Sequence, residues 1–304
     1  MPHVTDKNPV VEIKPLSFPW PTVDPFLFCA YHDDAYPAAN PDMGPADSLS
    51  GRAIGQDFSR KNGWSMYHGE TVPGFPGHPH RGFETVTFIL QGSLAHRDSG
   101  GHDSVINEGG VQWMTAGSGV IHAEVSPASF LEAGGPLEIL QLWVNLPARL
   151  KMSAPRYTGL QKDAIPALST ADGCGTVNLI AGSWGGHTGP FDSLTGVFMS
   201  TVTLQAGGAV RFPDVRGRNV FLYVVRGAVR IAGETAQQYR LLELNDDGES
   251  VDIVADTDAV LLFGHADAIG EPVVAQGPFV MNTRDEIQQA ARDYMDGKFG
   301  DALE

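Results

Sequence analysis

Cysteine is scarce in this sequence: its 304 residues include only Cys29 and Cys174. The two cysteines lie far apart and form no C-x-x-C pair, so neither a disulfide framework nor a cysteine-based metal site is indicated. Both are expected to be free, buried thiols.

Basic side chains are also few. Lys and Arg total 20 against 36 Asp and Glu, which gives a formal net charge of −16. A chain with this charge repels phosphate backbones and anionic lipid surfaces. We therefore expect no direct binding to nucleic acid or membrane, although the charge is compatible with a basic protein partner.

Long apolar runs are absent from the sequence. No stretch reaches the roughly 18 apolar residues that a membrane-spanning helix needs. The first residues, MPHVTDKNPVVEIK, lack the basic start and apolar run of a secretory signal. The sequence predicts a soluble, cytoplasmic protein, and the scarcity of long amphipathic patterns points away from an all-α fold.

Glycine and proline are abundant instead. The 36 Gly and 21 Pro punctuate short runs rich in Val, Ile, Leu and Phe, as short strands require. Residues 85–94, TVTFILQGSL, read as strand, glycine turn, strand, and residues 220–229, VFLYVVRGAV, repeat that pattern. We predict an all-β protein with two β-barrels, residues 1–150 and 151–304, that cross over within residues 147–167. The polar segment 40–65 is predicted to be a long loop.

One helix is predicted, at the C-terminal end. Thr283 and Glu286 fit a capping box, and apolar residues at 287, 290, 291, 294 and 295 fall on one helical face. Gly297 suits the position just after the helix end. We expect this helix to close one end of a barrel.

Two short pairs of potential metal ligands lie in the first half, HPH at 78–80 and HAE at 122–124. Residues two apart on a strand point to the same face, so each pair can aim two donors at one point. Imidazole together with carboxylate suits a borderline divalent metal. The sequence therefore predicts one mononuclear centre, and its expected ligands are His78, His80, His122 and Glu124.

Glu84 is the rival carboxylate. Counting forward from His80 gives Glu84 a spacing that barrel metalloproteins also use, whereas counting back from Gly92 gives that position to Thr85. A change of register by one residue moves a side chain to the opposite sheet face, and a bend or bulge at Gly82 would decide it. We prefer Glu124 and keep Glu84 as the alternative.

Three other histidines of the first half, His68, His96 and His102, are expected to be loop or surface groups or outer neighbours of the centre. Mutating His96 is expected to leave the metal in place. Gln112 lies on a predicted strand and is a candidate for the pocket lining, although strand residues of this kind more often belong to the core.

The second half repeats the scaffold without the metal-binding chemistry. Aligning Gly227 with Gly92 places Pro213 and Val215 where the HPH pair has its two histidines. One metal per chain is therefore expected, with the second barrel serving as a scaffold or as part of a substrate or partner surface.

Four stretches resemble the signatures of the pirin family, a branch of the bicupins. They are GHPHRGFETVT at 77–87, VQWMTAGSG at 111–119, HAE at 122–124 and GPFVMNT at 277–283. The resemblance implies two cupin-type barrels with a short C-terminal helix. It also implies one Fe(II) in the N-terminal barrel, held by the four ligands named above, and no metal ligands in the C-terminal barrel.

The resemblance further implies an activity. Some pirins cleave flavonols such as quercetin with O₂, and in this scheme Glu124 is both a ligand and the base that accepts the flavonol proton. The expected reaction is that of a quercetin 2,3-dioxygenase, with Fe(II) or another first-row divalent metal. The competing hypothesis is a non-enzymatic, iron-dependent redox regulator that binds a transcription factor or a metabolic enzyme.

Overall fold

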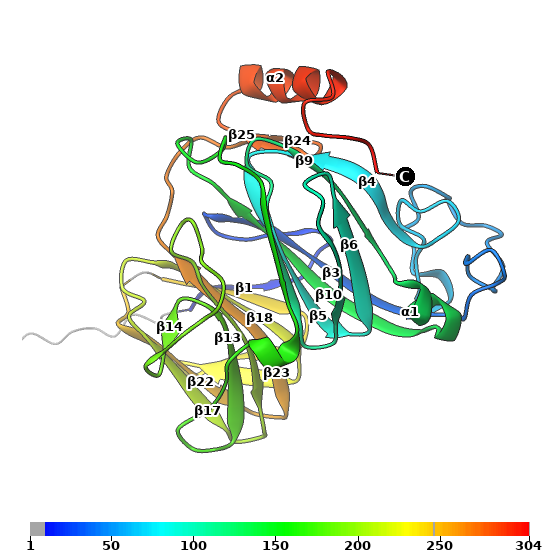
Figure 1. The fold of residues 1–304 in the computed structure, drawn as a ribbon. Coiled ribbons are helices and arrows are strands. Elements are labelled where there is room, and N and C mark those ends of the chain that lie inside the picture. Colours follow the sequence, from blue (N-terminus) through cyan, green and yellow to red (C-terminus); the bar gives the residue numbers. More distant parts are fainter. Residues whose placement is uncertain (1–9, 246, 304) are drawn as a thin grey trace, which may run out of the picture. The chain divides into compact units, whose positions relative to one another are not determined.

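The computed structural model describes residues 10–245 and 247–303, and in it the chain divides into two compact units (Figure 1). Unit 1 comprises residues 10–27 and 163–269, and unit 2 comprises residues 28–162 and 270–303. Both units are built from short antiparallel strands. The predicted all-β class is confirmed.

The units differ from the division at residue 150 that the sequence suggested. The crossover lies between residues 162 and 163, inside the stretch expected to contain it, but the first strands belong to unit 1 and the last 35 residues to unit 2. The C-terminal helix therefore belongs with the barrel that carries the HPH and HAE pairs. Whether residues 1–150 and 151–304 form two separate domains stays a prediction.

Unit 2 contains two facing antiparallel sheets. One has the strand order β11-β8-β5-β10-β3 and the other the order β4-β9-β6-β7. The strands are β3 (Phe26–Tyr36), β4 (Gly74–His80), β5 (Phe83–Gln91), β6 (Ser93–Asp98), β7 (Asp103–Asn107), β8 (Val111–Thr115), β9 (Val120–Val125), β10 (Gly135–Asn145) and β11 (Arg156–Leu160). A short helix that the sequence did not predict, α1 (Ala128–Ala133), precedes β10.

The predicted strand, glycine turn, strand pattern is present in both units. In unit 2, Gly92 has φ 82° between β5 and β6, and an added Cβ would lie 2.6 Å from the Pro136 carbonyl oxygen. In unit 1, Gly227 has φ 79° between β18 (Asn219–Arg226) and β19 (Ala228–Ile231). Glycine reaches this left-handed region without steric cost, which explains both turns.

The C-terminal segment of unit 2 forms a hairpin and a helix. The hairpin pairs β24 (Val274–Gln276) with β25 (Phe279–Met281), and α2 (Arg284–Met295) packs beside it (Figure 1). The capping box between Thr283 and Glu286 is confirmed. The predicted apolar face is confirmed only in part, because Ile287 and Ala290 are buried whereas Met295 is 76% exposed.

The predicted loop over residues 40–65 is confirmed: its helical content is a single 3₁₀ turn at Lys61–Gly63. The loop is fixed from within by Arg52, which donates to Asp57 at 2.7 Å and lies 3.5 Å from the centre of the Trp64 ring. A buried ion pair of this kind holds the loop in one arrangement.

Unit 1 also has two main sheets, ordered β1-β21-β18-β23-β16-β13-β12 and β17-β22-β19-β20, with a separate β14-β15 pair. Its other strands are β1 (Val10–Pro15), β2 (Trp20–Pro21), β12 (Ala167–Ser169), β13 (Gly175–Ala181), β14 (Ser183–Trp184), β15 (His187–Thr188), β16 (Phe198–Leu204), β17 (Ala209–Pro213), β20 (Glu234–Gln237), β21 (Arg240–Leu244), β22 (Ser250–Ala255) and β23 (Ala259–Ala266). A short 3₁₀ turn, η2 (Lys162–Ala164), precedes β12.

Apolar side chains fill the interior of unit 1. Phe212 and Phe263 stack with ring centres 4.0 Å apart inside a cluster made almost entirely of Val, Leu, Ile and Phe. Cys174 is only partly buried, in contrast to Cys29 of unit 2. No helix in the described part of the chain is long and apolar enough to cross a membrane.

Candidate metal centre

The two ligand-like pairs lie on adjacent strands of one sheet in unit 2. β4 carries His78 and His80, and β9 carries His122 and Glu124. His78 lies directly opposite His122 in the ladder, which is irregular between Phe75 and His78. Because side chains two apart share a face, this register directs the donors of both pairs to one side of the sheet.

Three imidazoles converge, as the sequence predicted. The ring centres of His78, His80 and His122 lie 4.4 to 4.8 Å apart, and Nε2 of His78 is 2.9 Å from Nε2 of His122. One ring nitrogen from each lies within 4.8 Å of the others. Glu124 adjoins this cluster, with its Oε2 4.0 Å from Nε2 of His122.

Burial keeps these imidazoles neutral. Desolvation lowers the pKa of His78, His80 and His122, so that their lone pairs are free at neutral pH. Nδ1 of His78 lies 2.8 Å from the Pro76 carbonyl oxygen, and Nδ1 of His80 lies 3.3 Å from that of Pro278. A carbonyl can only accept, so both rings carry their proton on Nδ1 and present Nε2 to the cluster.

Glu124 is held by neutral donors. Gln112 and Thr87 donate to its Oε1, and Gln141 donates to its Oε2 at 2.6 Å. Gln112 and Gln141 face Thr87 from the two neighbouring strands, so all three side chains share the inner face of the β5 sheet. The sequence offered Gln112 only as a pocket candidate and did not suggest Thr87 or Gln141.

Two ring groups orient these glutamines. Tyr157 Oη donates to Oε1 of Gln112 at 3.2 Å, and Trp143 Nε1 donates to Oε1 of Gln141 at 3.4 Å. Each glutamine oxygen is therefore occupied, which turns its amide NH₂ towards Glu124. The sequence signal that could have indicated these residues is the spacing of Gln141 and Trp143, which lie two apart on β10 and therefore share a face.

The rival carboxylate lies elsewhere. Glu84 precedes Thr85 on β5 and so points to the face opposite Thr85 and Thr87. Its Oε1 accepts from Thr115 Oγ1 at 2.6 Å, and burial raises its pKa to about 7. Glu84 belongs to neither of the two metal-compatible donor groups found among the described residues. Gly82, with φ 88°, is the bend that sets this register.

The other histidines separate into exposed and buried cases. His68 is exposed, and its Nδ1 lies 2.9 Å from the Gly55 carbonyl oxygen. The side chain of His102 is 44% exposed and lies 3.0 Å from Asp98. His96 is completely buried, so the expectation of a loop or surface residue is wrong for it.

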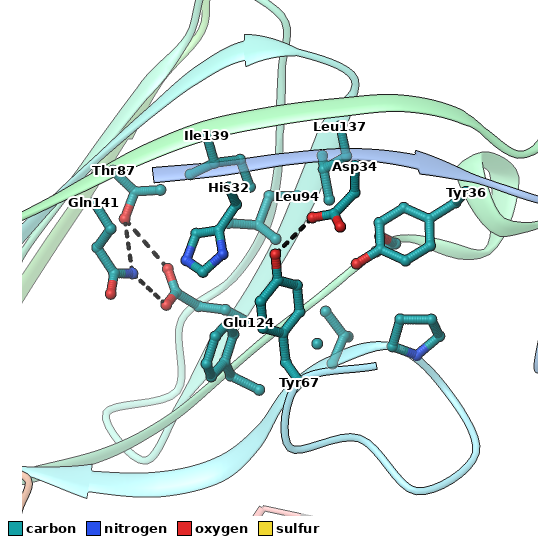
Figure 2. Close-up of a pocket in the computed structure, with 15 residues that line it drawn as sticks. His32, Asp34, Tyr36, Tyr67, Thr87, Leu94, Glu124, Leu137, Ile139 and Gln141 are labelled. Carbon is teal, nitrogen blue, oxygen red and sulfur yellow. Dashed lines mark hydrogen bonds between the residues drawn. The ribbon is translucent and has the colours of Figure 1, made fainter. Parts of the chain in front are cut away.

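A cavity adjoins Glu124, and His32, Asp34 and Tyr67 also line it (Figure 2). It is small, about 30 Å³, and runs from Glu124 to Asp34 between mostly apolar side chains. Tyr67 Oη donates to Oδ2 of Asp34 at 2.6 Å, whereas Oδ1 of Asp34 has no hydrogen-bond partner in the described structure. Burial raises the pKa of Asp34 to about 6. Neither Asp34 nor Tyr67 was predicted, because β3 and the loop after residue 65 carry no recognisable motif.

Comparison with protein families matches two models to this chain. The model described as Pirin matches residues 17–144, and the model described as Pirin C-terminal cupin domain matches residues 199–300. The chain belongs to the pirin family. The family resemblance of the four sequence stretches is thereby confirmed.

Relatives and solved structures agree with this assignment. Human pirin is 40% identical over 243 residues, which cover 77% of this chain and 80% of that protein. A Pseudomonas aeruginosa protein that is named provisionally as a quercetin 2,3-dioxygenase is 39% identical over 222 residues, covering 73% and 78%. The crystal structure of quercetin 2,3-dioxygenase from Acinetobacter baumannii superposes with a TM-score of 0.79 at 28% identity over 97% of both chains. The bicupin fold predicted for this pirin is confirmed.

Proposed function

We propose that this pirin is a mononuclear metal-dependent dioxygenase that cleaves a flavonol such as quercetin with O₂. His78, His80, His122 and Glu124 hold one metal ion, Fe(II) or another first-row divalent ion. The observation that carries the proposal is the convergence of three neutral imidazoles, two of them buried and that of His78 half-buried, within 4.8 Å of one another, beside a carboxylate.

The donor set fits such an ion on two grounds. Three imidazole nitrogens and one carboxylate oxygen suit borderline divalent metals and not Ca²⁺ or Mg²⁺, which take oxygen ligands. The carbonyl partners of His78 and His80 fix the tautomer that presents Nε2, the arrangement typical of metal-ligating histidines. When bound, iron would supply redox chemistry with O₂ and positions left open by the protein ligands.

Glu124 is the proposed base. A flavonol hydroxyl must lose its proton for the ring to react with O₂, and Oε2 of Glu124 accepts only the Gln141 amide, which leaves a lone pair for that proton. Gln112, Gln141 and Thr87 hold the carboxylate in place.

Relatives support the choice of substrate. The Pseudomonas aeruginosa relative and the Acinetobacter baumannii structure both carry the name of a quercetin dioxygenase. The aromatic side chains near the cluster suit a planar ring: Trp143 lies 5.1 Å from His80 and stacks on Phe83 at 4.1 Å, ring centre to ring centre. Glu124 also forms part of the lining of a small, mostly apolar cavity.

Anaerobic loading with Fe(II), followed by O₂-electrode and absorbance assays with quercetin, tests the proposal. We expect O₂ uptake that matches the loss of quercetin and that exceeds free iron. Glu124→Gln should lower the rate by about 100-fold or more, because a general base typically contributes 10²–10⁴-fold. Glu84→Gln, a matched change on the opposite face of β5, should leave it unchanged.

Two outcomes would contradict the proposal. Turnover equal to that of free iron would rule out flavonol cleavage, and specific binding of a protein partner in one iron oxidation state would then favour the regulator hypothesis. A loss of activity in Glu84→Gln, with Glu124→Gln unaffected, would overturn the ligand assignment.

A further inference from the structure

Unit 2 contains a second group of metal-compatible donors that overlaps the first. Among the described residues, ligand atoms of His96, His122 and Glu124 lie within 4.8 Å of one another, and all three residues are buried. His122 and Glu124 belong to the proposed centre, whereas His96 comes from β6, a strand that supplies none of its ligands. β6 pairs with β9, which places His96 directly opposite Glu124.

The ring of His96 is held in place by a carboxylate and an aromatic ring. Its Nε2 lies 3.0 Å from Oδ2 of Asp98, and Asp98 is itself fixed by the backbone N–H groups of Gly100 and His102 at 2.9 and 3.1 Å. The His96 ring stacks on Tyr157, with ring centres 4.0 Å apart and 9° between the planes. In many metal sites a carboxylate binds one nitrogen of a histidine whose other nitrogen binds the metal. The carboxylate then selects the tautomer of the histidine and orients its ring.

Two nitrogens of this group also lack partners. An unpaired buried polar atom costs about 1–3 kcal/mol, so a buried nitrogen without a partner beside other donors favours a bound ligand. Nδ1 of His96 and Nδ1 of His122 both lack a hydrogen-bond partner in the described structure, and neither is exposed. Asp98 occupies the other nitrogen of His96, so Nδ1 is the nitrogen left without a partner.

We propose that His96, His122 and Glu124 form a second cation position in the same barrel. The position would take a borderline divalent ion such as Co(II), Ni(II), Zn(II) or Fe(II), because its donors are two imidazoles and one carboxylate. It rests on the proposed function in that it shares His122 and Glu124 with the first position. One ion therefore occupies one position or the other, and the chain still binds a single metal.

This second position changes what the β4 histidines are needed for. If only the first position exists, removal of His78 and His80 leaves two donors and abolishes tight binding. With the second position, the same variant keeps three donors. In the wild-type protein, loss of His96 alone leaves the first position complete, which agrees with the expectation from the sequence that such a mutant retains its metal.

Co(II) binding by isothermal titration and elemental analysis, on the full-length protein, separates these cases. We expect the His78→Ala/His80→Ala variant to bind one Co(II) per chain, and a further His96→Ala change to weaken that binding by about 10- to 100-fold or more. Asp98→Asn in the double variant should weaken binding similarly, through the loss of ring orientation. His187→Ala, at an exposed histidine of unit 1, is the matched control.

Circular dichroism of each metal-free variant shows whether it is folded before titration. If the double alanine variant fails to fold, the same comparison is made with His78→Gln/His80→Gln, with and without a further His96→Ala change, by pulsed electron paramagnetic resonance of bound Cu(II). The second position predicts that the further change removes one coupled imidazole nitrogen.

Each remaining outcome decides the matter. Two outcomes would overturn the second position and leave the proposed function intact. In the first, wild type binds Co(II) and the folded double variant does not. In the second, the double and triple variants bind Co(II) equally well. Identical nitrogen couplings in the His78→Gln/His80→Gln variant with and without His96→Ala would also overturn it. Wild type that binds no Co(II) would contradict both the proposed function and this extension.

Discussion

At the scale of the residue, the carboxylate of Glu124 depends on two glutamines for its position. Gln141→Leu keeps the side-chain size but removes the 2.6 Å donor to Oε2. We expect metal affinity to fall by about 10- to 100-fold, which is the usual cost of losing an outer partner of a ligand. Competition titration with Co(II) measures the change. Gln205→Leu, at an exposed position of unit 1, should have no effect; an equal loss there would contradict the argument.

Burial of Asp34 predicts that the stability of the fold depends on pH. Its pKa of about 6 in the fold lies above the ordinary 3.8, so the folded protein holds a proton that the unfolded chain loses. Stability therefore falls as pH rises from about 4 to about 6 and stays lower above that range. The cost is about 3 kcal/mol, since one pKa unit corresponds to about 1.4 kcal/mol.

Replacing Asp34 by Asn should remove this cost, because the introduced amide oxygen can still accept from Tyr67. Urea unfolding at pH 4.5 and pH 8 measures it: the gain in stability should be about 3 kcal/mol at pH 8 and only about 1 kcal/mol at pH 4.5. Asp33→Asn, at a partly exposed neighbour that pairs with Arg60, is the control and should change little at either pH. An equal effect of Asp34→Asn at both pH values would show that burial of charge is not the cause.

Single residues differ in how far the sequence could identify them. The positions of His78, His80, His122 and Glu124 follow from a local rule, because residues two apart on a strand share a face. Gln141 depends on the register between β10 and β5, and His96 on the pairing of β6 with β9. Such pairings join residues that are distant in the chain, so no short motif records them.

At the scale of the element, Lys151 ties three segments of unit 2 together. Its Nζ donates to the carbonyl oxygens of Gly82 and Val280 and to Oδ1 of Asn145, at 2.7 to 2.9 Å. Gly82 ends the turn after the β4 histidines, Asn145 ends β10 and Val280 lies on β25. Burial lowers the pKa of Lys151 to about 8, so the ammonium is still mostly charged at neutral pH.

Lys151→Met should therefore destabilise the protein strongly. It would leave three acceptors unpaired, two of which, on Gly82 and Val280, are backbone carbonyls; at about 1–3 kcal/mol for each unpaired buried group, we expect a loss of at least about 3 kcal/mol. Urea unfolding at pH 7 measures this loss. The exposed Lys162 provides the control, since Lys162→Met should cost under about 0.5 kcal/mol. A small effect at Lys151 would mean that water replaces its contacts.

Elements with a local cause could be predicted and those with a distant cause could not. The glycine turns at Gly92 and Gly227 and the capping box of α2 are set by a few adjacent residues. The placement of the C-terminal segment in unit 2 is set by long-range contacts: Arg81 donates to Asp293 at 2.7 Å, and the Arg81 carbonyl accepts from the Val280 N–H at 3.0 Å. Nothing near residue 280 in the sequence indicates that partner.

At the scale of the whole molecule, one scaffold serves two purposes. Both units repeat the strand and glycine-turn pattern, but the interior of unit 1 is apolar, whereas that of unit 2 holds the imidazoles, the glutamines and Glu124. In unit 1, His265 is the buried histidine; it accepts from Arg218 at 2.6 Å, and burial lowers its pKa to about 3. Its ring is therefore committed to structure and adds no metal ligand.

Metal removal should therefore affect the two units differently. A bound ion stabilises only the structure that contains its ligands, by about 2.7 kcal/mol when its concentration is 100 times its dissociation constant. Hydrogen exchange followed by mass spectrometry, with and without a chelator, reads this effect peptide by peptide. We expect metal to protect β4 and β9 and to leave β16 and β18 unchanged, and His122→Ala should abolish the difference. Equal protection in both units would instead show that the ion stabilises the chain as one cooperative body, and that the apolar barrel is energetically coupled to the metal centre.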